Sequence, residues 1–291
     1  MIFKPAQREL PEVKKIRKKK LKPPFVDGRW AIVGLFLLTA FASLLFYLKT
    51  EVPLFWQRIT SPVVISTLPE RFDPTPALNE VESLTQDLRG TYGVYVYRLD
   101  EQVKYGLHQN EVFPAASLIK LPVMLTLYQE GEKDNLELAD YRKMAEAMGK
   151  RSDNASFNQL VRVLGEKKIQ KTIDDLGMRK TSLAENETNP ADISLIFQEL
   201  YQGGFISSEH REEILGFLTD TEFEDRIPAG IPEGIRVAHK IGNELGSFSD
   251  AGIIFSQNPF ILVIISKDAR EAEANQVLPE IAKIVWEFET R

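Results

Sequence analysis

Strand-like segments occur near both ends of the globular part of this chain, and only helical patterns separate them. Strands are expected where β-branched and aromatic residues gather between turn residues, at 91–98, 103–107, 236–241, 252–255 and 260–266. Apolar residues at helical spacing predict helices at 78–88, 117–130, 136–149, 155–164, 166–176, 190–201, 208–218 and 269–288. This order predicts an α+β fold. One antiparallel sheet is built from both ends of the domain, is flanked by helices and carries an inserted all-helical subdomain. A cleft between sheet and subdomain is the natural place for a site.

The segment 30–48 has nineteen residues without a formal charge. A helix of this length crosses the roughly 30 Å of hydrocarbon in a bilayer. Residues 1–29 carry ten Lys or Arg against three Asp or Glu, which predicts that this tail stays in the cytoplasm and the rest lies outside. We expect an uncleaved single-pass membrane anchor. The alternative is a cleaved signal peptide, since Ala40-Phe41-Ala42 has the small-x-small form of a cleavage site.

Beyond the anchor, the prolines in 49–76 predict a linker, and 77–291 has the patterning of a globular domain. Outside the basic tail, 26 basic residues face 39 acidic ones, which argues against nucleic acid as a partner. The chain has no cysteine and three scattered histidines, which excludes a thiol nucleophile and makes a histidine triad or a metal site unexpected. There is no glycine-rich phosphate loop, so we expect no cofactor and no metal.

Three short motifs follow one another along the globular domain. Ser117 and Lys120 are three residues apart at the start of an apolar helix, so they share one face and the amine can serve as the base that activates the hydroxyl. Ser152-Asp153-Asn154 lies in a loop that leads into a helix, and Lys240-Ile241-Gly242 lies on a strand. On that strand, His239 should point to the opposite face from Lys240. Each motif alone is weak evidence for an active site. The order of the three motifs, and the helix, loop and strand on which they lie, make the set stronger evidence.

This set resembles that of the class A serine β-lactamases and the related penicillin-binding proteins, whose motifs are S-x-x-K, S-D-N and K-T-G in this order. The resemblance covers roughly three quarters of the chain, from about residue 78 to 291, and none of the anchor. It implies a β-lactamase/transpeptidase-like fold. It further implies an enzyme that is acylated by a small-molecule β-lactam or a cell-wall peptide. We expect a monomer.

The resemblance also implies roles for individual residues. Ser117 would attack a carbonyl carbon, Lys120 would be its base, and Ser152 would pass a proton to the departing nitrogen. Asn154 would hold the substrate amide and position Lys120, while Asp153 would brace the loop. Lys240 would attract the substrate carboxylate.

The third motif and its neighbour would complete the site. Gly242 belongs to the substrate-binding strand, and the backbone N–H of Asn243 would form the oxyanion hole with that of Ser117. Ile241 departs from the family, which has Ser or Thr there to bind the substrate carboxylate. Asn243 or Ser247 are the nearby side chains that could replace that hydroxyl.

A second departure concerns deacylation. Class A enzymes carry a long loop with a glutamate that activates the hydrolytic water, whereas here only 181–189 precedes the helix at Pro190. Glu185 and Glu187 are the carboxylates in this short loop, either as solvated acids or as a repositioned base. Three functions therefore stay open: a slow β-lactamase, a penicillin-binding-like peptidase on cell-wall peptides, and a catalytically silent, membrane-tethered binding or sensor domain. In a further alternative, all three motifs are structural accidents, with Ser117 and Ser152-Asp153-Asn154 as helix caps.

Overall fold

A computed structural model describes residues 32–33, 35–44 and 72–291 of the chain. The chain divides into two units, Met1–Arg71 and Phe72–Arg291. In the first unit, residues 32–33 and 35–44 are helical, and their apolar side chains, such as that of Phe36, are exposed. Across the described ranges, no helix is both long enough and apolar enough to cross a membrane. The predicted anchor at 30–48 lies partly outside these ranges, and the basic tail at 1–29 lies wholly outside them.

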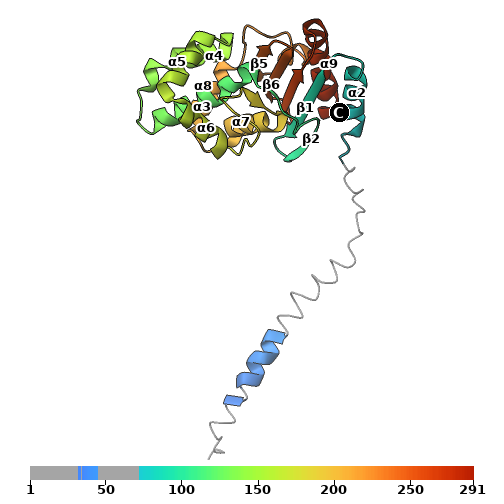
Figure 1. Cartoon of the computed structure of the whole chain (residues 1–291). Coiled ribbons are helices and arrows are strands. Elements are labelled where there is room, and N and C mark those ends of the chain that lie inside the picture. The colour runs from blue at the N-terminus through green and yellow to red at the C-terminus, as the bar shows by residue number, and fades with distance from the viewer. Residues whose placement is uncertain (1–31, 34, 45–71) are drawn as a thin grey trace, which may run out of the picture. The chain divides into compact units, whose positions relative to one another are not determined.

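The second unit contains a five-stranded antiparallel sheet in the order β2-β1-β7-β6-β5 (Figure 1). The strands are β1 (Thr91–Arg98), β2 (Val103–Leu107), β5 (Val237–Glu244), β6 (Ser247–Ile254) and β7 (Phe260–Lys267). Strand β1 pairs with β7 in a register that sets Val94 opposite Ile264, so the two ends of the domain meet at the centre of the sheet. The predicted sheet built from both ends is therefore confirmed, and β5 is an edge strand.

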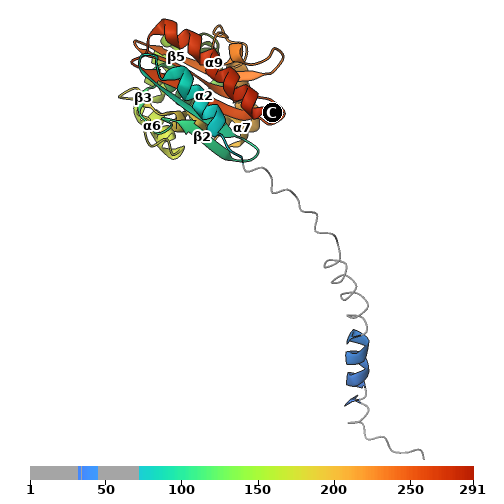
Figure 2. The same cartoon turned by 90° about the vertical axis from the view of Figure 1, so that its right-hand side faces the viewer.

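Helices cover both faces of this sheet. Helices α2 (Thr75–Thr85) and α9 (Glu271–Glu289) lie side by side against one face, as Figure 2 shows. Helix α7 (Pro190–Gln202) packs against the other face, on the side of the helical subdomain. That subdomain contains α3 (Lys120–Glu132), α4 (Arg142–Arg151), α5 (Asn154–Leu164), α6 (Glu166–Asp175) and α8 (Ser208–Phe217). The inserted all-helical block is thus present as predicted.

The alternation of side chains along the strands creates two apolar cores. In β7, Leu262 and Ile264 pack into the core beneath α2 and α9, while Ile261, Val263 and Ile265 pack into the core shared with the helical subdomain. All five are fully buried, because successive side chains of a strand point to opposite faces and both faces are covered. Sequence patterning located these strands, although it did not locate the short ribbon of β3 (Phe113–Pro114) and β4 (Glu187–Thr188).

The folded unit begins with residues that the sequence had placed in the linker. The Phe72 ring packs against Tyr105 and Phe288 with centroids 5.6 Å apart in both cases, and the Arg98 guanidinium lies 4.7 Å from its centroid. Pro74 then precedes the first turn of α2, where a proline ring costs no hydrogen bond. These contacts fix the entry of the chain into the domain.

A buried ionic group braces β5 from behind. His239 is fully buried, with Nδ1 2.8 Å from Asp250 Oδ1 and Nε2 3.3 Å from Glu224 Oε1. Its neighbour Lys240 points the other way, as predicted, and reaches Ser152. Burial disfavours the charged imidazole, but the carboxylates of Asp250 and Glu224 outweigh burial and raise the pKa of His239 to about 9. The protonated ring therefore ties β5 to β6 and to the loop that holds Glu224.

This group predicts a specific dependence of stability on pH. Because the folded pKa of His239 lies near 9 and an unfolded histidine has about 6.5, protonation stabilises the fold fully below about pH 6.5. The contribution, on the order of 3 kcal/mol, is lost as the pH rises through about 9. Other groups that titrate in this range affect wild type and His239→Gln alike, so we expect the loss to appear in the difference between their free energies of unfolding in urea. His239→Gln should unfold more easily than wild type at low pH, and this difference should shrink as the pH rises through about 9.

His108→Gln is the matched control, because His108 is exposed and its ring contacts only Glu111 among the described residues. It should keep the wild-type profile. Identical pH slopes for wild type and His239→Gln would show that His239 is not protonated in the folded chain.

Candidate active site

The candidate nucleophile lies in a strained turn between the sheet and the helical subdomain. Ser117 belongs to the 3₁₀ turn η1 (Ala116–Ile119), and α3 begins at Lys120. The α-helix thus begins three residues later than predicted, with Pro122 in its first turn, where its missing N–H is tolerated. Ala116 has φ of 46°, in the left-handed region that a residue with a Cβ rarely adopts. Such strain is typical of functional turns, and here it sets the direction of the Ser117 side chain.

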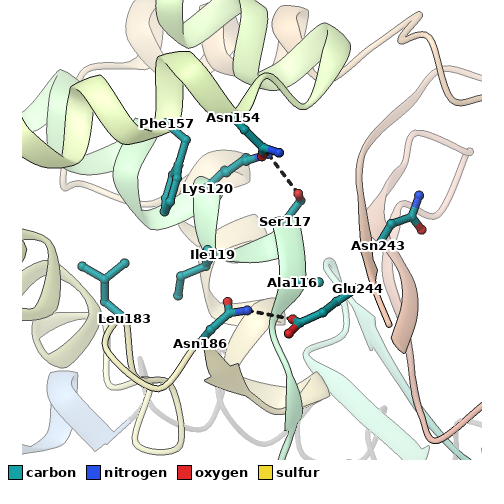
Figure 3. Close-up of a pocket in the computed structure, with 10 residues that line it drawn as sticks. All are labelled: Ala116, Ser117, Ile119, Lys120, Asn154, Phe157, Leu183, Asn186, Asn243 and Glu244. Carbon is teal, nitrogen blue, oxygen red and sulfur yellow. Dashed lines mark hydrogen bonds between the residues drawn. The ribbon is translucent and has the colours of Figure 1, made fainter. Parts of the chain in front are cut away.

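Lys120 Nζ lies 2.9 Å from Ser117 Oγ, 2.7 Å from Asn154 Oδ1 and 3.1 Å from Ser152 Oγ (Figure 3 shows the first two partners). It also lies 2.5 Å from the Ser152 carbonyl oxygen. Burial lowers the pKa of Lys120 to about 8, and the negative charge of Asp153 only partly opposes this. About one tenth of the amine is therefore neutral at pH 7, far more than for an ordinary lysine.

A count of hydrogen bonds shows what the neutral amine would do. Neutral Lys120 has two N–H donors and one lone pair. The Ser152 carbonyl and Asn154 Oδ1 can only accept, and they are its two nearest partners. When they take both donors, the lone pair is left for a hydroxyl. Ser117 Oγ, at 2.9 Å, is the nearer hydroxyl, so the geometry equips Lys120 to take the Ser117 proton.

The second motif is a sharp turn between α4 and α5. Ser152 has φ of 55° and ends α4, while the Asp153 carboxylate caps α5 by accepting from the Ser156 N–H at 2.7 Å. The predicted bracing role of Asp153 is confirmed. Because the chain reverses at Ser152, both its carbonyl and its hydroxyl face Lys120, and Asn154 follows at once as the first residue of α5.

The third motif brings a second buried amine to the same hydroxyl. Lys240 Nζ lies 2.8 Å from Ser152 Oγ and 2.9 Å from the Ile241 carbonyl oxygen. Burial and then the nearby Lys120 charge lower the pKa of Lys240 to about 7, although Asp250 opposes them. Ser152 Oγ therefore lies between two amines that can each exchange a proton with it.

Gly242 lets β5 approach the nucleophile turn. A Cβ at this position would lie 2.3 Å from Ser249 Oγ, 3.2 Å from the Ala116 Cβ and 3.3 Å from the Ala115 carbonyl oxygen. A larger residue would push the strand away from Ser117. The glycine is thus explained by close packing, and it brings Asn243 to the wall of the same pocket as Ser117.

The pocket has a volume of about 300 Å³. Four predicted site residues line it, namely Ser117, Lys120, Asn154 and Asn243. Lys240 and Gly242 are buried behind this wall. Sequence reasoning missed five further lining residues with chemical relevance, Ile119, Phe157, Leu183, Asn186 and Glu244. Phe157 could have been found, because it follows Asn154 by three residues on one helix face.

The two loop acids do not line this pocket. Glu185 accepts a hydrogen bond from the Ser182 hydroxyl, and Glu187 is an exposed residue of β4. Leu183 and Asn186 of the same loop face the pocket instead. A role for Glu185 or Glu187 as a deacylation base stays a prediction that this arrangement does not favour.

The missing hydroxyl at Ile241 has a candidate replacement. Ile241 and Ser247 are buried and neither lines the pocket, whereas Asn243 does. The buried Arg226 donates from Nη2 to Asn243 Oδ1 at 2.5 Å, which leaves the Asn243 amide N–H groups as donors. Arg226 also donates to the Ser249 carbonyl at 2.7 Å, and no pattern in the sequence singled it out.

An antiparallel sheet beside a helical block, with a serine, two lysines and a second serine at their junction, defines the β-lactamase-like class of active-site serine proteins. The sequence matches the Beta-lactamase enzyme family over residues 75–147 and 139–288, so the chain belongs to this family. A search of curated proteins gave no match.

Solved structures share the fold. A β-lactamase from Sphaerobacter thermophilus DSM 20745 is 21% identical with a TM-score of 0.69, over 74% of this chain and 97% of that chain. PBP-A is 21% identical with a TM-score of 0.68, over 75% and 97%. A class A β-lactamase described as the last common ancestor of Gram-negative bacteria is 20% identical with a TM-score of 0.68, over 72% and 98%.

Proposed function

We propose that this protein is a serine acyl-enzyme former that reacts through Ser117 with β-lactams or related amides and releases the acyl group slowly. The observation that carries the proposal is the contact between Lys120 Nζ and Ser117 Oγ at 2.9 Å. The Ser152 carbonyl and Asn154 Oδ1 accept the two N–H groups of the neutral amine, which leaves its lone pair for the Ser117 hydroxyl. Family membership and fold support it. A mutant of PBP-A, one of the proteins with a similar fold, is described as an acyl-enzyme complex with penicillin G.

The reaction can be followed atom by atom. Neutral Lys120 takes the Ser117 proton while Oγ forms a bond to the carbonyl carbon. The carbon–nitrogen bond then breaks, and the departing nitrogen takes a proton from the Ser152 hydroxyl. Ser152 lies within 3.1 Å of Lys120 Nζ and 2.8 Å of Lys240 Nζ, so either amine, when protonated, can restore that proton. The product is an ester of Ser117.

Slow release follows from the wall that faces Lys120. Hydrolysis of the ester needs a water molecule activated by a base. The neighbouring residues Ile119, Phe157 and Leu183 are apolar, and the acids of the short loop do not line the pocket. Glu244 does line it, but at the end away from Asn154, where it accepts a hydrogen bond from Asn186 (Figure 3). This favours a long-lived acyl-enzyme of the penicillin-binding type over rapid β-lactam hydrolysis.

Covalent labelling tests the proposal. A fluorescent penicillin incubated with the full-length chain should label it in a one-to-one ratio at Ser117, and the label should persist for many minutes after excess probe is removed. Ser117→Ala should abolish labelling, because the ester cannot form. Gel fluorescence and mass spectrometry of the modified peptide measure both results.

Asn158→Ala provides a control on α5 that lies outside the pocket lining and should label normally. Equal labelling of Ser117→Ala and wild type would contradict the assignment of the nucleophile. Absence of label in a folded wild-type chain would overturn the β-lactam reaction and leave a binding domain without acylation.

The apolar wall predicts a gain of function. Leu183 lines the pocket, and its backbone N–H donates to Gln170 Oε1 at 3.0 Å, which holds the residue in place. Leu183→Glu would put a carboxylate beside the ester, where a general base typically contributes about 10²–10⁴ in rate. We expect the label on Ser117 to decay at least about tenfold faster. The time course of label loss measures this.

Leu183→Gln is the matched control, since it has the size and polarity of glutamate without the base. It should release the label at nearly the wild-type rate. Equal acceleration by both variants would show that wetting of the wall, rather than a base, limits release.

We also propose that residues 30–48 anchor the chain in the membrane with the acylating domain outside the cytoplasm. The uncharged run and the basic residues before it support this arrangement. The full chain should sediment with membranes and be released by detergent but not by high salt, and a chain without residues 1–48 should stay in the supernatant. Membrane association that survives this deletion would contradict the proposal.

A further inference from the structure

One end of the pocket is formed by the polar side chains of Asn186 and Glu244 (Figure 3). Asn186 Nδ2 donates to Glu244 Oε2 at 2.8 Å, which joins the loop before α7 to the end of β5. In Figure 3 this pair lies beyond Ala116, at the end of the pocket away from Asn154. The group belongs to the same cavity as Ser117, but the acylation steps above do not use it.

Both members of this pair are held in place by the backbone. The Asn186 carbonyl accepts from the Ala115 N–H at 2.7 Å, two residues before the nucleophile. Glu244 pairs with Ser247 in the last rung of the β5–β6 hairpin. The pair is therefore pre-organised relative to Ser117, as a specificity site requires.

The charge of Glu244 is available to a ligand. Glu244 is the only carboxylate among the residues that line this pocket, and its side chain is exposed. Within the described part of the chain it forms no ion pair, and its hydrogen-bond partner is a neutral amide. Asn186 Oδ1 is buried and has no donor among the described residues, so the role of Asn186 is to hold Glu244 through its amide N–H. The carboxylate of Glu244 is thus the acceptor that this end offers to a group with several N–H donors.

The opposite end of the pocket has the reverse polarity. Lys120 lines it and Lys240 lies buried behind it, while Asn243, next to Glu244 on β5, adds N–H donors to the wall. A substrate carboxylate is attracted to these donors and repelled by Glu244. A cationic group on the same substrate is attracted to Glu244 and repelled by the two amines, so the two charges together orient the substrate in the pocket.

We propose that Glu244 is a specificity-determining residue that makes the site prefer substrates whose acyl group carries a protonated amine. The inference rests on the proposed acylation of Ser117 and adds to it the chemical class of the acyl group. The apolar wall of Phe157 and Leu183 accepts the uncharged part of that group, and the Glu244 carboxylate, held by Asn186, accepts its ammonium end.

Three penicillins that differ in one substituent of the same phenylacetyl group test this inference. Ampicillin carries an amine, penicillin G a hydrogen, and carbenicillin a carboxylate at that carbon. The second-order rate constants for acylation of the full-length chain are measured by competition with a fluorescent penicillin, at a pH where the amine is protonated. Wild type, Glu244→Gln and Glu244→Lys are compared.

For wild type we expect ampicillin to react faster than penicillin G and carbenicillin slower, with about 1.5-fold to fivefold between neighbours, as is usual for exposed charge pairs. Glu244→Gln should remove most of this spread and Glu244→Lys should reverse the order. The spread should also shrink as salt rises from about 0.1 M to about 1 M, because the Debye length falls from about 10 Å to about 3 Å.

Glu146→Gln is the control for net charge, because Glu146 is exposed on α4 and does not line the pocket. It should keep the wild-type order and spread. Thermal unfolding of each variant confirms that it is folded before its rates are compared.

Three results would overturn the inference. Equal rates for the three penicillins in wild type, or the same spread in Glu244→Gln as in wild type, would each show that Glu244 does not read the charge. A change in Glu244→Gln confined to the decay of the acyl-enzyme would assign Glu244 to deacylation instead. Failure of all three penicillins to acylate folded wild type would overturn the proposed function, and the inference with it.

Discussion

The burial of Lys120 is the constraint on which the rest of the site depends. An ammonium group that is 2% exposed is costly, so its environment must either pair the charge or lower the pKa. Here the nearest partners are a carbonyl and a carboxamide oxygen, which accept hydrogen bonds without supplying a full negative charge. The carboxylate that acts on Lys120, that of Asp153, already accepts a hydrogen bond as the cap of α5. The site therefore raises the neutral fraction of the amine well above that of an ordinary lysine, and a neutral amine beside a serine hydroxyl is a base.

Several unusual backbone features serve this one arrangement. The left-handed conformations of Ala116 and Ser152 turn the nucleophile and the Ser152 carbonyl toward the amine. The absence of a side chain at Gly242 lets the edge strand approach the nucleophile turn. Behind that strand, the protonated His239 holds β5 against β6, so Lys240 meets Ser152 from a fixed direction. The left-handed residues cost local stability, and the two large apolar cores on either side of the sheet offset this cost.

Around this centre the pocket is chemically divided. One end is rich in amines and N–H donors, the wall beside the loop is apolar, and the far end carries Glu244 and Asn186. The short loop explains this division, because it places Leu183 and Asn186 on the pocket and leaves Glu185 and Glu187 outside it. Acylation, slow release and preference for a cationic acyl group are thus linked proposals, since one short loop contributes to the last two.

The order of elements, the split sheet and the grouping of Ser117, Lys120, Ser152, Asn154 and Lys240 were predictable along the sequence, and the fold brings these five side chains together. Periodicity and motif spacing are local properties, and local properties can be read along a chain. Tertiary structure alone decided that Arg226 orients Asn243, that His239 pairs with Asp250, and that Glu244 rather than Glu185 or Glu187 faces the pocket. These contacts join segments that are distant in sequence or depend on which way a loop turns. No spacing rule encodes either, because side-chain direction in an irregular loop is set by packing against the rest of the fold.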